Sequence, residues 1–137
     1  MNLGPVLIID DDVAMVEAVQ EMLQEAGHST AVACNGFHGL KLAREAKPSV
    51  IVCDMKMPNM AGADVFRALA SDPATAHIPR VLMTGHSDAD RSLANAFLLK
   101  PFEPRQIVEM MQRMTSTSST PLVPRKHVVL TDAHWRG

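Results

Sequence analysis

Short apolar runs alternate along the chain with longer segments in which apolar residues recur at helical spacing. The short runs are rich in β-branched residues, which is typical of strands buried on both faces of a sheet. The longer segments carry apolar residues three or four positions apart, as amphipathic helices do. We expect strands at residues 5–9, 28–34, 50–54, 80–84 and 96–99, and helices at 13–26, 37–46, 62–71 and 103–114.

Strands that alternate with helices in this way form a parallel sheet with helices on both faces, an α/β fold. Residues 87–93 leave room for only a short helix, and from Thr115 the composition changes to Ser, Thr and Pro. We therefore expect one folded domain over residues 1–114 and a flexible tail over residues 115–137. Within that tail, residues 127–130 have the composition of a strand.

The bulk composition is that of an ordinary globular chain of 137 residues, 47% hydrophobic and 20% charged, with a net charge of −2. This weak acidity, with no basic helix after Met114, argues against nucleic-acid binding. No run approaches the roughly 18 apolar residues of a membrane span. Two cysteines, Cys34 and Cys53, make no disulfide framework, so we expect buried reduced thiols and a cytoplasmic location.

Polar residues follow four of the five predicted strands, namely Asp10–Asp12, Asp54, Thr84 and Lys100. The carboxyl ends of parallel strands meet at one edge of a sheet, where open α/β sheets bind ligands. Carboxylates gathered there repel one another unless a cation joins them, and oxygen ligands favour Mg²⁺ or Mn²⁺. Since a carboxylate is an accepted nucleophile for phosphoryl transfer, the pattern predicts transfer onto Asp54, with Asp10 and Asp11 holding the metal. Lys100 and Thr84 supply a cation and a hydroxyl donor.

Four motifs occur in order, Val6-Leu7-Ile8-Ile9-Asp10-Asp11-Asp12, Asp54 with Met57-Pro58-x-x-x-Gly62, Thr84-Gly85, and Lys100-Pro101-Phe102. On these motifs the chain resembles the receiver domain of bacterial two-component response regulators over about residues 4–114. The resemblance implies a doubly wound, flavodoxin-like sheet of five parallel strands in the order 2-1-3-4-5, as in chemotaxis regulators. It also implies a signalling domain that accepts phosphate rather than an enzyme.

Specific roles also follow from this resemblance. The implied Mg²⁺ ligands are Asp10, Asp11, Asp54 and the backbone carbonyl of Lys56. The implied phosphoryl-site residues are Asp54 as acceptor, Lys100 and Thr84 as contacts, and Phe97 in place of the family's aromatic switch residue. The implied partners are a histidine kinase or histidine phosphotransfer protein, and an output partner that the sequence does not identify. We also expect the Lys56 side chain, two positions after the acceptor, to alter the lifetime of the phosphorylated form.

One departure from the family concerns the segment between the fourth and fifth predicted strands. Thr84 and Lys100 lie only 16 positions apart, fewer than in ordinary receivers. The missing length falls within residues 85–96, where the family has its fourth helix, so we expect that helix to be shortened or missing. Because this helix normally belongs to the surface used for dimerisation or output, we expect a monomer or a weak dimer.

Two alternative functions stay open on the sequence alone. Ile9-Asp10-Asp11-Asp12-Val13 also fits the DxD strand end of haloacid-dehalogenase-type phosphatases, in which Asp10 would be the nucleophile. That alternative leaves Asp54 and the Lys100-Pro101-Phe102 turn without a role. The other alternative is a binding module of the same fold that takes no phosphate.

Overall fold

The computed structural model describes residues 4–85, 92, 94–115 and 128–130. The strands are β1 (Val6–Ile9), β2 (Thr30–Ala33), β3 (Val50–Asp54), β4 (Arg80–Thr84), β5 (Ala96–Leu99) and β6 (Val128–Leu130). The helices are α1 (Val13–Glu25), α2 (Gly36–Ala46), α3 (Gly62–Ser71) and α4 (Pro104–Thr115). The nine elements predicted up to residue 114 are all present, each with ends within two residues of the expected ones.

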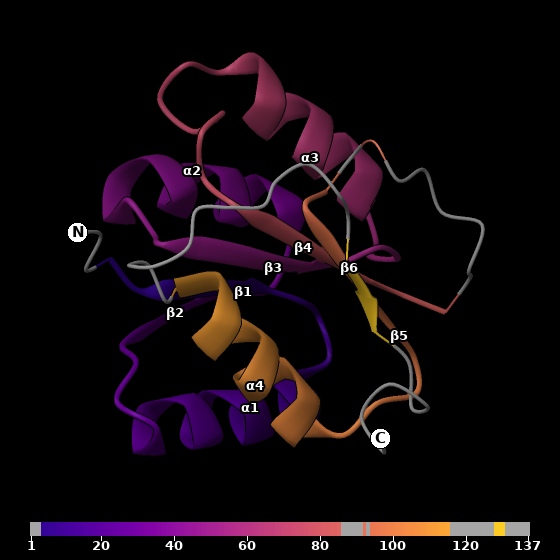
Figure 1. Cartoon of the computed structure of the whole chain (residues 1–137). Coiled ribbons are helices and arrows are strands. Elements are labelled where there is room, and N and C mark those ends of the chain that lie inside the picture. The colour runs from indigo at the N-terminus through magenta and orange to yellow at the C-terminus, as the bar shows by residue number, and fades with distance from the viewer. Residues whose placement is uncertain (1–3, 86–91, 93, 116–127, 131–137) are drawn as a thin grey trace.

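All neighbouring strands in the sheet run parallel, in the order β2-β1-β3-β4-β5-β6. The predicted order 2-1-3-4-5 is confirmed, and a sixth strand from the predicted tail joins the sheet beyond β5. Helices α1 and α4 cover one face of the sheet, and α2 and α3 cover the other (Figure 1). The described residues between β4 and β5 contain no helix, and all but Ser92 of the segment expected to hold a short helix, residues 87–93, lie outside the described residues.

The core lies in two layers, one on each face of the sheet. Alternate residues of the central strands face opposite layers, so Ile8 and Val52 pack toward α1 and α4, whereas Leu7 and Ile51 pack toward α2 and α3. Strands β1 and β3 are buried along their whole length. Burial of each such aliphatic side chain contributes about 1.5–3 kcal/mol, which explains why uninterrupted apolar runs form the middle of the sheet.

Side-chain caps fix where the first two helices begin. Asp12 caps α1, accepting a hydrogen bond from the backbone N–H of Met15 at 3.2 Å, and Asn35 caps α2 through the N–H of His38 at 2.8 Å. Gly27 follows the end of α1 with φ at +97°, a left-handed backbone conformation that favours glycine and commonly ends a helix. These caps direct both helices away from the carboxyl edge of the sheet and leave that edge to the loops.

The two cysteines differ in their surroundings. Cys53 lies buried in β3 and Cys34 is exposed after β2, and both are free thiols. The expectation of a buried thiol is therefore wrong for Cys34, because β2 is the outermost strand on its side and the chain leaves the sheet directly after Ala33. None of the helices that the structure describes is long and apolar enough to cross a membrane.

Candidate functional site

Three carboxylates meet at the carboxyl edge of the two central strands. Asp54 is the last residue of β3 and Asp10 directly follows β1, and the pairing of Ile9 with Cys53 places the two acids side by side. Asp10 is 2% exposed and Asp54 5%, whereas Asp11 faces solvent. Carboxylate oxygens of Asp10, Asp11 and Asp54 all lie within 4.8 Å of one another. The structure thus brings together the acids that the sequence pattern selected.

A lysine from the neighbouring turn reaches this cluster. Lys100 follows β5, and its Nζ donates a hydrogen bond to Oδ1 of Asp54 at 2.7 Å. The backbone N–H of Lys100 donates to the carbonyl oxygen of Thr84 at 2.8 Å, which ties the end of β5 to the end of β4. Thr84 itself is 2% exposed as the last residue of β4. Thr84 at the end of β4 and Lys100 directly after β5 therefore lie at the ends of the two strands that follow β3 in the sheet.

The electrostatics of Asp10 fit a site built around a cation. Its Oδ1 accepts a hydrogen bond from the N–H of Asp12 at 3.0 Å, but its buried Oδ2 has no hydrogen-bond partner among the described residues. Burial raises the pKa of Asp10 to about 6, and the charge of Asp54 adds to that rise, while the bond from Asp12 opposes it. A buried carboxylate oxygen without a donor favours a bound cation.

Lys100 is held in its charged form. Its partial burial lowers its pKa, but the hydrogen bond to Asp54 and the charges of Asp54, Asp10 and Asp12 outweigh that effect. The net result is a raised pKa for Lys100, so the ammonium group keeps its charge at neutral pH. This group compensates one carboxylate of the cluster, and the remaining negative charge favours binding of a further cation.

Gly62 holds the loop that leaves β3 against the backbone of Asp54 and Met55. The N–H of Gly62 donates to the carbonyl oxygen of Met55 at 2.8 Å. A Cβ at this position would lie 2.9 Å from the Cα of Met55 and closer still to the carbonyl oxygen of Asp54. Sequence analysis placed Gly62 only within a motif, because this backbone contact shows solely in three dimensions. Lys56, within the loop, extends an exposed side chain.

Phe97, which the sequence analysis placed at the position of the aromatic switch residue, lies in the core. Phe97 is 2% exposed in β5 and packs in the core layer under α2 and α3. It therefore occupies a core position in this structure, on the strand that ends at Lys100. His86, the residue after the Thr84-Gly85 motif, lies outside the residues that the structure describes.

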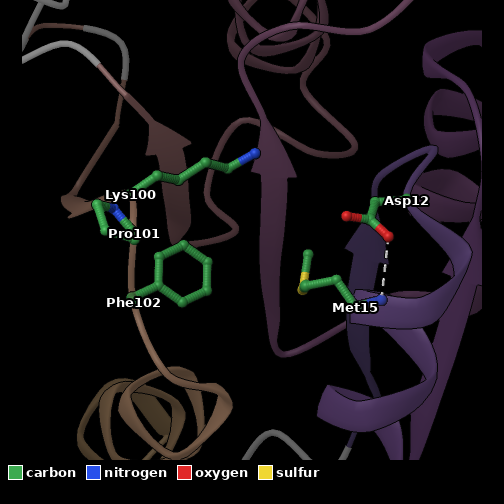
Figure 2. A pocket seen from close by; sticks show the side chains of 5 residues that line it. All are labelled: Asp12, Met15, Lys100, Pro101 and Phe102. Carbon is green, nitrogen blue, oxygen red and sulfur yellow. Dashed lines mark hydrogen bonds between the residues drawn. The ribbon is translucent and has the colours of Figure 1, made fainter.

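A cavity of about 430 Å³ opens beside the site. It lies between the start of α1 and the turn from β5 to α4, and its lining residues are Asp12, Met15, Lys100, Pro101 and Phe102 (Figure 2). Met15 packs against the core and is only partly buried, because it also forms part of the cavity wall, opposite Phe102 in Figure 2. Because Lys100 belongs both to this wall and to the ion pair with Asp54, the cavity adjoins the acid cluster.

Comparison with known proteins assigns the chain to a family. Residues 6–112 match the response regulator receiver domain. The DNA-binding response regulator MtrA of Mycobacterium tuberculosis strain H37Rv is 32% identical over 109 residues, which cover 75% of this chain and 46% of MtrA. The chain therefore spans about half the length of this curated relative.

Two shorter proteins match over nearly their whole length. Protein PilH of Pseudomonas aeruginosa is 31% identical over 110 residues, covering 76% of this chain and 91% of PilH. The crystal structure of the chemotaxis response regulator CheY4 of Vibrio cholerae superimposes with a TM-score of 0.75 at 27% identity, covering 82% of this chain and 99% of CheY4. With its CheY-like sheet and strand-end acids, the chain belongs to the response regulator receiver domain family of two-component signalling proteins.

Proposed function

We propose that this receiver domain accepts a phosphoryl group on Asp54 in a Mg²⁺-dependent reaction and thereby changes its interactions with an output partner. The donor would be a phosphohistidine of a histidine kinase or histidine phosphotransfer protein. The observation that carries the proposal is the 2.7 Å bond between Lys100 Nζ and Asp54 Oδ1 at the edge of a three-carboxylate cluster. This bond joins a candidate nucleophile to a cation that can hold a phosphoryl oxygen.

The transfer needs a nucleophile, a charge partner and a hydrogen-bond donor. A carboxylate oxygen of Asp54 attacks phosphorus, a P–O bond forms as the P–N bond breaks, and the donor imidazole keeps the electron pair. Lys100 lies beside Asp54 and offers its positive charge to an oxygen of the transferred group. The hydroxyl of Thr84, at the end of the adjacent strand, is the group that we assign as a donor to a second oxygen.

The metal would be held by Asp10, Asp11, Asp54 and the backbone carbonyl of Lys56. The donor set consists of oxygen atoms only, which suits Mg²⁺ and allows Mn²⁺ as a substitute. The buried Oδ2 of Asp10, which has no hydrogen-bond partner among the described residues, supports this assignment. When bound, the ion supplies charge neutralisation to the phosphoryl oxygens.

The partner that donates phosphate would approach over the cavity beside Lys100. Apolar surface flanks this cavity, since Val13 at the start of α1 is 62% exposed and Met15 and Phe102 form part of the wall. Exposed apolar groups next to a charged site are a common feature of protein docking surfaces. A helix that presents its phosphohistidine to Asp54 could cover Val13 and the cavity at the same time.

Two observations favour Asp54 over Asp10 as the nucleophile, and so favour the receiver over the phosphatase alternative. Lys100 is bonded to Asp54 rather than to Asp10. One oxygen of Asp10 accepts a hydrogen bond from the N–H of Asp12, and the other is buried without a hydrogen-bond partner among the described residues. Asp10 is therefore better suited to binding a cation than to attacking phosphorus.

Phosphorylation by acetyl phosphate, a small-molecule donor, tests this function. We expect the full chain to gain the mass of one phosphoryl group with Mg²⁺ and no gain with EDTA, with borohydride reduction and peptide mapping placing the group on Asp54. Asp54→Asn should abolish the gain, whereas Asp64→Asn, which changes an exposed acid on α3, should leave it intact. Absence of any gain in the native chain, or a full gain in Asp54→Asn, would overturn the proposal.

A further inference from the structure

The edge of β5 that faces away from β4 carries a further strand, β6. Strand β6 pairs in parallel with β5, with Ala96, Phe97 and Leu98 opposite Val128, Val129 and Leu130. Strand β5 has the sequence Ala-Phe-Leu-Leu, which contains no charged residue and no proline. An apolar strand without such protection readily accepts another strand at a free edge. The pairing with β6 covers this edge in the structure.

The hand of the connection sets this pairing apart from the rest of the sheet. The hand of a parallel crossover depends on the direction of the step along the sheet and on the face that carries the helix. The β1–α1–β2 and β3–α3–β4 connections step in opposite directions with helices on opposite faces, so they share one hand (Figure 1). The β5–α4–β6 connection steps in the same direction as β3–α3–β4, but α4 lies on the face of α1. It therefore has the opposite hand.

This opposite hand is disfavoured in a single chain. Parallel crossovers are right-handed in about 98% of cases, because a twisted strand and a helix pack back onto the sheet only in that way. The restriction applies to two strands joined through a helix of the same chain. It does not apply when the added strand comes from another molecule.

We propose that the β5 edge is an interface between two copies of this chain, in which β6 of each copy adds to β5 of the other in the parallel register described above. Such strand exchange preserves the pairing of β5 with β6 and removes the disfavoured hand. Residues 116–127 separate α4 from β6 in the sequence, and a stretch of twelve residues has a maximum extended length of about 40 Å. The interface does not depend on phosphorylation of Asp54.

The experiment compares the full chain with two double variants in β6. Val128→Pro with Val129→Pro removes a backbone N–H on each side of β6, so it disrupts the pairing whichever residue donates to β5. Val128→Ile with Val129→Ile keeps both N–H groups and the β-branched side chains, and serves as the matched control. Size-exclusion chromatography with light scattering gives the mass of each protein over a dilution series, and circular dichroism verifies that each is folded.

We expect a mass of twice 14.9 kDa for the native chain and the isoleucine variant, and a folded monomer for the proline variant. In a dimer refolded from ¹⁵N-labelled and unlabelled chains, isotope-filtered NMR should show contacts from labelled β5 amides to unlabelled β6 protons. A monomeric native chain, a proline variant that stays dimeric, or β5–β6 contacts confined to one chain would overturn the proposal. Because the phosphorylation assay reads Asp54 independently, either proposal can fail without the other.

Discussion

At the scale of single residues, hydrogen-bond partners give the two buried acids of the site different properties. Asp10 and Asp54 are almost equally buried, but Lys100 bonds only to Asp54. Asp10 keeps an oxygen without a hydrogen-bond partner among the described residues, and its pKa rises from 3.8 to about 6. Without a cation, the ionised form of Asp10 is therefore a source of instability in the folded protein.

The contribution of Asp10 to stability without metal should consequently fall as the pH rises. Between pH 4 and pH 6 the folded state retains the Asp10 proton while the unfolded state has lost it, so this contribution to the free energy of unfolding decreases over this window. The shift from 3.8 to about 6 corresponds to a loss on the order of 3 kcal/mol, complete above pH 6. Asp10→Asn removes the charge, and we expect it to raise the free energy of unfolding at pH 7 in EDTA.

Urea unfolding at pH 4 and pH 7 measures this effect. The gain from Asp10→Asn should be present at pH 7 and absent at pH 4, where the native carboxyl is protonated in the folded state. Asp64→Asn, at an exposed acid, should change stability by no more than about 0.5 kcal/mol at either pH. An Asp10→Asn variant less stable than the native chain at pH 7 in EDTA would contradict the account of Asp10.

Lys56 provides a second prediction at this scale. Its side chain is exposed two positions after Asp54, and we expect it to pair with the phosphoryl group and slow hydrolysis. An exposed ion pair contributes at most about 1 kcal/mol, so Lys56→Ala should speed dephosphorylation by up to about fivefold. Decay of phosphorylated protein in Mg²⁺ gives the rate, with Lys41→Ala, an exposed lysine of α2, as control. Equal rates for Lys56→Ala and the native chain would remove this role.

At the scale of elements, the connection from β3 to α3 fixes the position of the backbone around Asp54. Gly62 begins α3 and at the same time lies against the backbone of Asp54 and Met55. The hydrogen bond from its N–H to the Met55 carbonyl closes the loop that contains Lys56. A change at the first residue of α3 is thus transmitted directly to the loop that would supply a backbone metal ligand.

Gly62→Ala should therefore weaken both stability and metal binding. Its Cβ would overlap backbone atoms that cannot move aside as a flexible side chain can, so we expect a loss of about 1–3 kcal/mol in the free energy of unfolding. Mg²⁺ affinity should fall as the loop shifts. Gly85→Ala is the control, since no described atom lies within 4 Å of a Cβ there. Equal urea midpoints and Mg²⁺ affinities in Gly62→Ala and the native chain would contradict this role.

At the scale of the whole molecule, the sequence predicts those features that depend on local pattern. Apolar runs such as residues 50–53 identify strands that are buried on both faces. The convergence of Asp10, Asp54 and Lys100 was also predicted, because parallel strands place all their carboxyl ends at one edge. Pattern and topology together therefore position the candidate site.

Features that depend on long-range packing could not be obtained from the sequence. The exposure of Cys34 follows from the place of β2 at the edge of the sheet, and the unpartnered oxygen of Asp10 follows from burial between strands. The composition of residues 127–130 suggested a strand, but only the structure shows that β6 joins β5. The contact of Gly62 with Asp54 depends likewise on the path of a loop.

The most direct test of the central claim, phosphorylation at Asp54, is Mg²⁺-dependent binding of beryllofluoride, which imitates a phosphoryl group on a carboxylate. Amide NMR of the full chain would follow residues around Asp54 and Phe97, with Asp54→Asn and Asp10→Asn for comparison. We predict binding that requires Mg²⁺, is abolished by Asp54→Asn, and is weakened by Asp10→Asn. Normal binding by Asp54→Asn, together with none by Asp10→Asn, would instead identify Asp10 as the acceptor and contradict the account.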